Sequence, residues 1–491
     1  MAVASLKREL GLRDLVLTQI LFVVGLSNFG FAAKLGAAHA VFWLTAIVLF
    51  YIPTAMVVIR LNSWRPLEGG LYQWAHAAFG DLAGFLVAWN LWIYAMALMS
   101  EIGIVTVTNL AYAIGPSAVP LAENKVVLTV VTAALVLGLA AVSILGLSVG
   151  KWIYNLGGVT VLILIGALLA ANFVPHSRAT LSLKPPPLTL LNLNILGKLA
   201  FFALGGFEYV AVFAGECKDP ARMIARSVVI SAPIIAALFI FGTGAVLAVV
   251  EPGQVDLVSP VLQAISVAAR PLGLAVHLAS GFFALLLVSR LAQASINFAV
   301  NSRLPMVAGW DHLLPEWFTK LHPVRRTPIN STLFVAAVTL ALALAGIAGA
   351  GRQEAFQLLQ NASGIFYGLT YLAMFAIPIL GYAEASIALR AAAVSGFGMT
   401  LLCVVLSVFP IIDVPNPWGF TLKVGGTVTG LNLVGWLIYR RTSRGLKRSS
   451  RSSTSSMVVP GGMVTSGPRE PNTPASPAAA PAAAPIPKPI P

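Results

Sequence analysis

Long apolar runs recur along most of the chain, and short segments with charged residues, glycine or proline separate them. A continuous apolar run of roughly 20 residues can cross the hydrocarbon core of a bilayer as an α-helix. About twelve such runs occur between residues 14 and 440. Membrane-spanning β-strands would instead alternate apolar and polar residues over about 10 positions. The pattern therefore predicts an all-α polytopic membrane protein with about twelve transmembrane helices.

The runs divide the chain into three parts. Residues 1–13 form a cytoplasmic N-terminus, residues 14–440 a transmembrane domain, and residues 441–491 a tail that is basic at first and then rich in Ala and Pro. We expect the tail to be disordered, because its composition cannot bury enough apolar surface to fold. The predicted helices lie near residues 14–36, 41–61, 80–113, 125–145, 151–172, 197–216, 227–250, 271–301, 329–350, 355–380, 386–410 and 418–440.

Composition agrees with a membrane protein, since 58% of the residues are hydrophobic and 10% are charged, against about 25% charged in soluble domains. In a soluble protein a net charge of +14 would suggest a nucleic acid partner. Here the cluster RRTSRGLKRSSR directly follows the last apolar run, where basic residues mark the cytoplasmic face and attract anionic lipid. We therefore expect lipid contacts at the tail and no nucleic acid binding.

An even number of spans puts both termini on one side of the membrane. Lys and Arg residues between the spans are more numerous on that side than on the opposite side, to which Lys198 is assigned. The positive-inside rule then places both termini in the cytoplasm, in a plasma membrane or bacterial inner membrane. The sequence leaves the oligomeric state open.

Two predicted helices carry small and polar residues at mid-membrane depth. The first, VLTQILFVVGLSNFGFAAKLG, has Gly25, Ser27 and Asn28 there, and the sixth has Gly205 and Gly206. Discontinuous helices five spans apart are typical of an inverted repeat of five helices. The alternative is that these small residues only let helices pack closely. The predicted repeats cover about residues 14–172 and 197–380, and two further helices follow at about 386–440.

Helix ends exposed at two such breaks can bind a zwitterion. Free N–H groups at a helix N-terminus attract a carboxylate, and free carbonyl groups at a C-terminus attract an ammonium group. An α-amino acid offers both groups, whereas an amine would use only the carbonyl end. The predicted substrate-binding residues are Gly25, Ser27, Asn28 and Phe29 at the first break, and Ala203, Leu204, Gly205, Gly206 and the gate candidate Phe207 at the sixth.

Three ionisable residues stand out near mid-membrane depth in the predicted spans: Glu101, Glu208 and Arg290. Each costs about 2.5–3.5 kcal/mol at the centre of a membrane helix, so such residues tend to be paired and functional. We expect Arg290 to pair with one of the two acids, and Glu208, beside the sixth-helix break, to carry the proton of coupled transport. A static ion pair that holds spans together is the alternative. Glu101 as a selector for cationic substrates is a further hypothesis.

Three segments of the chain resemble the amino acid–polyamine–organocation (APC) superfamily. They are FFALGGFE with the following AGECKDPARMIARS, PLEGGLYQWA, and SRLPMVAGWDHLLPEWFTKLHPVRRTP. The resemblance covers about residues 10–440 and implies an amino acid transporter that works by alternating access. The first span of the family usually carries a GSGI-like run. This chain has GLSNF in that place, which is more similar to sodium-coupled relatives of the same fold. The Lys that sodium-independent relatives often carry in the fifth span is absent from residues 152–172.

These observations predict a secondary active transporter of amino acids that works by proton-coupled symport or by exchange. A transporter of polyamines or other organic amines, a sodium-coupled transporter, a sensing receptor and a channel are the alternatives. An enzyme is not expected, because GLSVG at 146–150 matches G-x-S-x-G without the preceding strand that such a nucleophile needs. The sequence has no HExxH motif, Cys/His cluster or phosphate-binding loop, so no metal or cofactor is expected.

Overall fold

The fold of the protein comes from a computed structural model that describes most of the transmembrane region. The described residues are 11–65, 70–145, 159–160, 163–170, 182–184, 187–206, 220–270, 275–307, 314, 316–323, 327–348 and 350–455. Within these ranges the regular structure is helical and contains no strand. The prediction of an all-α membrane protein is therefore confirmed.

The first half of the chain supplies the helices of the first predicted repeat. The first span consists of two short helices, α1 and α2, and the third predicted span is formed by α6 and α7, which meet at Glu101. The bounds are α1 (Leu12–Val23), α2 (Asn28–Ala33), η1 (Gly36–Ala38), α3 (His39–Ala46), η2 (Ile47–Tyr51), α4 (Ile52–Trp64), α5 (Leu71–Phe79), α6 (Asp81–Ser100), α7 (Ile102–Ile114), η3 (Pro116–Ala118), α8 (Val119–Glu123) and α9 (Lys125–Leu145).

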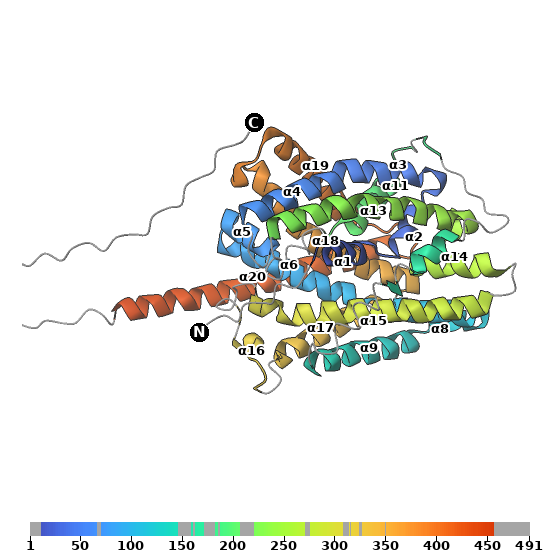
Figure 1. Cartoon of the computed structure of the whole chain (residues 1–491). Helices are drawn as coiled ribbons and strands as arrows, with labels where there is room; N and C mark the ends of the chain where they lie inside the picture. Colours follow the sequence, from blue (N-terminus) through green and yellow to red (C-terminus); the bar gives the residue numbers. More distant parts are fainter. Residues whose placement is uncertain are drawn as a thin grey trace, which may run out of the picture. The chain divides into compact units, whose positions relative to one another are not determined.

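The second half contains the longest helices. Figure 1 shows them running beside those of the first half, with α1 and α18 in the interior of the bundle. The bounds are α11 (Leu190–Lys198), η6 (Leu199–Ala203), α13 (Pro220–Val249), η8 (Pro252–Gln254), α14 (Pro260–Ala269), α15 (Ala275–Val307), α16 (Glu316–Thr319), α17 (Ile329–Ile347), α18 (Arg352–Ile379), η10 (Tyr382–Glu384), α19 (Ile387–Leu406) and α20 (Pro417–Ser455).

Seven helical segments among the described residues are long and apolar enough to cross a membrane. They match the predicted second, third, fourth, seventh, ninth, tenth and eleventh spans. The first predicted span is divided into α1 and α2, the sixth is described only as far as Gly206, and most of the fifth lies outside the described residues. The eighth and twelfth coincide with α15 and α20, which also contain long polar segments.

The first and sixth helices end where the sequence predicts a break. Helix α1 stops at Val23 and α2 starts at Asn28, so Gly25 lies in a non-helical segment. In the sixth helix, a π-helical segment (η6) precedes the end at Leu204, and Gly206 has a φ of 124°. That backbone conformation is strained for residues with a Cβ, which explains the glycine. The expected discontinuity is therefore present up to the last described residue, Gly206.

Aromatic side chains pack around the sixth-helix break. The two π-helical segments, η2 and η6, face each other through Phe50 and Phe201, whose ring centroids lie 5.7 Å apart. Tyr371 of α18 contacts both rings, at 6.0 Å from Phe50 and 5.1 Å from Phe201. π-helical turns occur often at functional sites. Here two of them meet beside a broken helix.

The last helix is fixed to α6 by a pair of amides. Asn90 and Asn432 each donate to the other's side-chain oxygen, at 2.8 and 3.1 Å. One turn further along α20, a Cβ at Gly435 would lie only 2.6 Å from Trp89 Nε1, so the close approach requires glycine. Small residues and interhelical hydrogen bonds are the usual means of packing helices in lipid.

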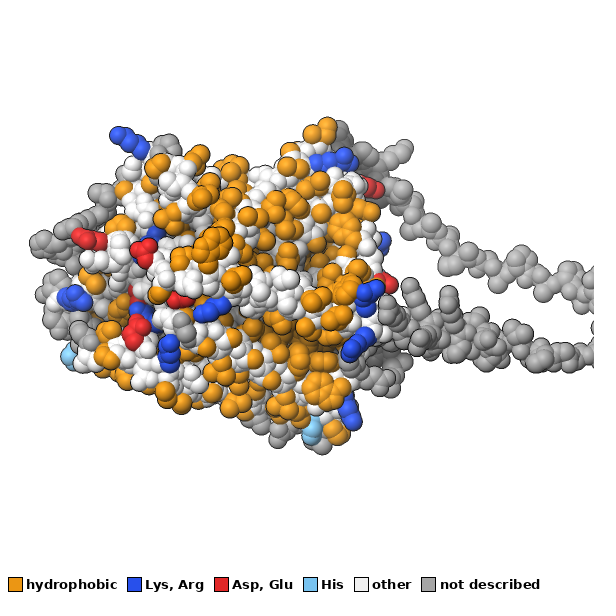
Figure 2. All heavy atoms as spheres, turned by 180° about the vertical axis from the view of Figure 1, so that it is seen from behind, with side chains coloured by type: hydrophobic (Ala, Val, Ile, Leu, Met, Phe, Trp, Pro, Cys, Tyr) orange, Lys and Arg blue, Asp and Glu red, His pale blue; other side chains and the backbone are white. Residues whose placement is uncertain are grey.

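The outer surface of the bundle is largely apolar. Figure 2 shows hydrophobic side chains over the middle of the molecule and charged side chains mainly near its two ends. On α9, for example, Val126, Val130 and Leu137 are exposed. An apolar surface of this extent suits contact with lipid and would be unfavourable in water.

Two features of the structure differ from the sequence-based expectations. Lys198, assigned to a surface on the opposite side from the termini, is fully buried within the bundle. Residues 441–455, expected to be disordered, continue α20 as helix to Ser455. The segment after Arg441 contains no proline before that point, so a helix already formed in the membrane can propagate through it. Residues 456–491 lie outside the described residues.

Candidate substrate site

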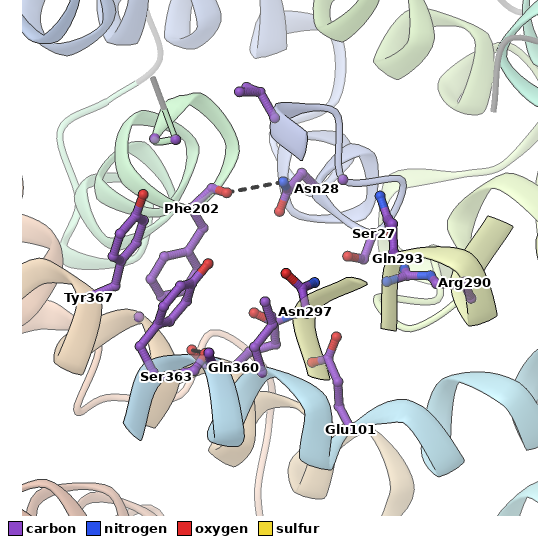
Figure 3. Close-up of a pocket in the computed structure, with 18 residues that line it drawn as sticks. Ser27, Asn28, Glu101, Phe202, Arg290, Gln293, Asn297, Gln360, Ser363 and Tyr367 are labelled. Atoms are coloured by element: carbon purple, nitrogen blue, oxygen red, sulfur yellow. Dashed lines mark hydrogen bonds between the residues drawn. The ribbon is translucent and has the colours of Figure 1, made fainter. Parts of the chain in front are cut away.

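A cavity of about 140 Å³ lies where the two broken helices meet the third, eighth and tenth predicted spans. Figure 3 shows its polar side chains arranged around a common space. Ser27 and Asn28 border it on one side, and Glu101 borders it on the opposite side. The lining residues are Val23, Gly25, Ser27, Asn28, Tyr94, Ala95, Leu98, Glu101, Phe202, Gly205, Gly206, Arg290, Gln293, Asn297, Gln360, Ser363, Gly364 and Tyr367.

The structure brings most of the sequence-predicted substrate residues to this cavity. Gly25, Ser27 and Asn28 line it from the first break, and Gly205 and Gly206 line it from the sixth. Three other candidates are not among the lining residues: Phe29, Ala203 and Leu204, whose side chains are buried in the core. Phe207 and Glu208 lie outside the described residues.

A hydrogen bond connects the two breaks directly. Asn28 Nδ2 donates to the carbonyl oxygen of Phe202 at 3.3 Å. The backbone N–H of Asn28 donates to the Gly25 carbonyl at 3.0 Å, and the N–H of Gly206 donates to Tyr371 Oη at 2.8 Å. Side chains and tight turns therefore satisfy part of the backbone exposed at the breaks, as a non-helical segment at membrane depth requires.

Glu101 and Arg290 face the same cavity, from the junction of α6 and α7 and from α15 respectively. Glu101 is 3% exposed, attracts Arg290 electrostatically and accepts a hydrogen bond from Gln360. Its second carboxylate oxygen, Oε2, is buried without a hydrogen-bond partner among the described residues. Arg290 and Glu101 thus attract each other electrostatically, whereas any contact with Glu208 lies outside the described residues, so the pairing of Arg290 with one of the two acids stays a prediction.

Sequence reasoning missed most of the polar residues contributed by α15 and α18. On α15, Arg290, Gln293 and Asn297 follow one another at i, i+3 and i+7, and on α18 the same spacing joins Gln360, Ser363 and Tyr367. That spacing places each set on one helix face. A search for polar stripes in otherwise apolar spans would have found both sets.

Aromatic side chains of the third span divide between the cavity and the helix packing. Tyr94 lines the cavity and stacks on Tyr367, with ring centroids 4.2 Å apart and planes 8° from parallel. Trp89 and Trp92 point elsewhere and donate to the carbonyl groups of Leu431 and Asn301. Tyr94 is therefore the aromatic residue of this helix that can contact a ligand.

Lys198 lies one helical turn before Phe202. Its Nζ donates to Asn361 Oδ1 at 2.5 Å and lies 5.0 Å from the centroid of the Phe202 ring. No carboxylate among the described residues forms an ion pair with it. The Phe202 ring, which lines the cavity, therefore contacts a buried cation through one face.

Broken helices around a polar cavity in the middle of an apolar bundle define the class of membrane transporters with discontinuous helices. The profile of the family described as "Amino acid permease" matches residues 12–439 of the chain. The chain belongs to this family. It is accordingly a transporter rather than an enzyme, and the expected relation to amino acid permeases is confirmed.

Individual relatives are distant but extensive. An uncharacterized transporter of Legionella pneumophila is 27% identical, with 76% of this chain and 81% of the relative covered. The Branched-chain amino acid permease BcaP of Bacillus subtilis is 24% identical, with 73% and 80% covered. The "Probable agmatine/putrescine antiporter AguD" of Lactococcus lactis is 23% identical, with 59% and 61% covered. These names indicate amino acids and small amines as substrates of similar proteins.

Proposed function

We propose that the protein is a secondary active transporter that moves α-amino acids across a membrane by alternating access. The observation that carries this proposal is that both helix breaks border one polar cavity. The substrate carboxylate would bind at the start of α2, where Ser27 and Asn28 lie and the helix dipole is positive. The substrate ammonium group would bind near Gly205 and Gly206, where the sixth helix ends and the dipole is negative.

For the coupling ion, we propose a proton, in symport or in exchange, and we assign it to Glu208. The position of Glu208 two residues after Gly206 supports this assignment. An acid at membrane depth costs free energy, so acids in such positions tend to be functional. Sodium coupling is the alternative, supported by the GLSNF run at the first break.

A transporter of polyamines or other organic amines is a second candidate function. The similarity to AguD favours it. The Glu101 carboxylate in the cavity is the group that an ammonium would contact, in competition with Arg290. Such a substrate would bind the carbonyl end at the sixth break and leave the start of α2 without a carboxylate partner.

We further propose that the protein resides in a plasma or bacterial inner membrane with both termini in the cytoplasm. The basic residues at the end of α20, from Arg440 onward, would then contact anionic lipid. Labelling of single cysteines introduced at residues 5 and 460 with a membrane-impermeant reagent, in intact and in permeabilised cells, tests this topology. Labelling in intact cells would contradict it.

Transport by purified protein in liposomes tests the function. A thermal-shift screen against amino acids and amines comes first, because a ligand that binds only the folded state raises its apparent stability. The uptake of each labelled ligand found in this screen is then measured in two kinds of proteoliposome. One kind contains no substrate, and the other is loaded with unlabelled substrate. Saturable uptake that depends on a gradient or on loaded substrate supports a carrier. Uptake that never saturates would indicate a channel, and binding without uptake would indicate a sensing receptor.

The coupling ion is tested by imposing a proton or a sodium gradient on the same liposomes. We expect the inward proton gradient to drive accumulation, and Glu208→Gln to retain exchange while losing that accumulation. Glu384→Gln is the matched control, because Glu384 is an exposed acid that pairs with Arg60 and is not among the residues that line the cavity. An unchanged response to the proton gradient in Glu208→Gln would remove the assignment of the proton to this residue.

A further inference from the structure

A second cavity adjoins the substrate cavity. It has about 90 Å³ and lies between the third span, formed by α6 and α7, and α15. It shares five residues with the first cavity, and the rest of its lining is mostly apolar. The shared residues, here called the common wall, are Leu98, Glu101, Arg290, Gln293 and Asn297.

Glu101 of the common wall lies opposite the first helix break. Figure 3 shows Glu101 across the space from Asn28, whereas Gln293 and Arg290 lie beside Ser27. A substrate whose carboxylate lies beside Asn28 at the start of α2 can therefore direct its other end toward Glu101. The second cavity extends the available space in that direction.

Glu101 has an unsatisfied acceptor at this wall. Gln360 donates to its carboxylate and Arg290 attracts it, but Oε2 is buried without a hydrogen-bond partner among the described residues. An unpaired buried acceptor is unfavourable, because it has given up hydrogen bonds to water. A donor group on the substrate would remove this cost, so the geometry indicates a ligand atom at this place.

The charge of the wall limits what kind of donor fits. Among the described lining residues of both cavities, Glu101 and Arg290 are the acidic and basic members, and their formal charges cancel. An ammonium or guanidinium group on the substrate would compete with Arg290 for the carboxylate and would lie near a like charge. A hydroxyl or carboxamide group can donate to Oε2 without disturbing the pair, and the amides of Gln293 and Asn297 supply further donors and acceptors.

We propose that the preferred substrates are α-amino acids with a small neutral side chain that donates a hydrogen bond, a hydroxyl or a carboxamide, and that Glu101 is the residue that selects them. This inference rests on the proposed function and goes further by naming the substrate class. The aliphatic side chains carried by branched-chain amino acids would leave Oε2 unsatisfied, and cationic side chains would oppose Arg290.

Isosteric pairs of competitors test the proposal on the unmodified protein. Threonine and valine have nearly the same shape but differ in one hydroxyl group, and asparagine and leucine differ in the same way in a carboxamide. Sites built to hydrogen-bond a substrate group reject the analogue that lacks it. We expect threonine and asparagine to compete for uptake into proteoliposomes at concentrations at least tenfold lower than valine and leucine. Equal or reversed preference, or preference for lysine or putrescine, would overturn the proposal.

The role of Glu101 is tested with Glu101→Gln and Glu101→Leu beside the control Glu384→Gln. In Glu101→Leu we expect the preference for threonine over valine to fall to less than threefold. Glu101→Gln keeps an acceptor and should retain part of the preference, whereas the control should retain all of it. A preference that persists unchanged in Glu101→Leu would overturn the assignment.

Two results separate the inference from the proposed function. If neither amino acids nor amines shift the thermal transition or are transported, the proposed function fails. If amino acids are transported but aliphatic or cationic ones are preferred, the transporter assignment stands and only the selection by Glu101 is overturned. Should the Glu101 variants not fold, the competition series on the unmodified protein still decides the substrate class.

Discussion

Two clusters of charged residues in this protein differ in how completely their hydrogen bonds are satisfied. The first surrounds Arg352 at the start of α18, and the second is the pair of Glu101 and Arg290 at the cavity. Arg352 donates to Asp256 at 2.8 Å and to Glu123 at 3.1 Å. The Asp256 carboxylate also accepts from Tyr112 Oη at 2.9 Å and from the backbone N–H of Val258 at 2.8 Å.

The difference indicates different roles. The Arg352 cluster joins α18 to α8 and to the segment before α14, and its members bond one another. The Glu101 carboxylate, by contrast, keeps one oxygen without a partner in the described part of the chain and lines two cavities. A satisfied network holds helices together, whereas an unsatisfied buried group indicates a place for a ligand. The predictions below test this distinction.

The largest effect is expected for Arg352→Met. Asp256 would remain buried without its cationic partner, and breaking a buried pair from one side costs about 3–5 kcal/mol. Thermal or denaturant unfolding in detergent measures the loss. The substrate preference of the remaining folded protein should not change, and a loss below about 1 kcal/mol would show that the cluster does not hold the helices together.

Arg290→Met should destabilise less, by about 1–3 kcal/mol, because the hydrogen bond from Gln360 to the Glu101 carboxylate remains when the cation is removed. Its effect on selectivity should be greater. With the compensating cation removed, we expect competition by lysine or putrescine to improve at least tenfold relative to threonine. A destabilisation equal to that of Arg352→Met, with unchanged selectivity, would contradict the distinction between the two clusters.

Tyr112→Phe removes a single donor from a carboxylate that keeps its other partners. The hydrogen bond to a charged group contributes about 1.5–3 kcal/mol, and we expect the lower end because Arg352 and backbone N–H groups remain on Asp256. The change in unfolding free energy is measured against the unmodified protein. Combining it with Arg352→Met in a double-mutant cycle should show coupling of the two effects, whereas simple additivity would indicate independent contacts.

Glu384→Gln should have the smallest effect, within about 1 kcal/mol. The Glu384 side chain is 93% exposed and its 3.3 Å contact with Arg60 is solvated, so the pair gains little over its separated ions. Unfolding and uptake should both match the unmodified protein. A large change in the unfolding free energy or in uptake would mean that this exposed ion pair contributes more to stability or transport than its exposure predicts.

The sequence was sufficient to predict the helices, because the length and continuity of an apolar run depend only on neighbouring residues. The breaks were predictable for the same reason, since Gly25 lies in the non-helical segment between α1 and α2 and Gly206 adopts a positive φ where the sixth helix ends. The chemistry of the site was predictable only in part. Gln293 and Asn297 reach the cavity through the rotation of α15 about its own axis, which its neighbours determine.

Lys198 is a residue whose position the sequence predicted wrongly. Its charge and its place near the start of an apolar run suggested a surface position. Helix α11, however, begins at Leu190, so Lys198 lies more than two turns from the start of the helix, and its side chain is fully buried. Asn361 and the Phe202 ring, which come from α18 and from the next turn, compensate its burial. The sequence alone does not show that the side-chain amide of Asn361, on a distant helix, accepts a hydrogen bond from Lys198.

The reciprocal amides of Asn90 and Asn432 have a mechanical consequence. These two hydrogen bonds join α6 of the third span to α20. Gly435 packs so closely against Trp89 that the two helices have little room to slide past each other. In the proposed alternating-access cycle we therefore expect the third span, which carries Glu101, to stay fixed relative to α20. The motion that opens the cavity to one side and then to the other would then come from the broken helices.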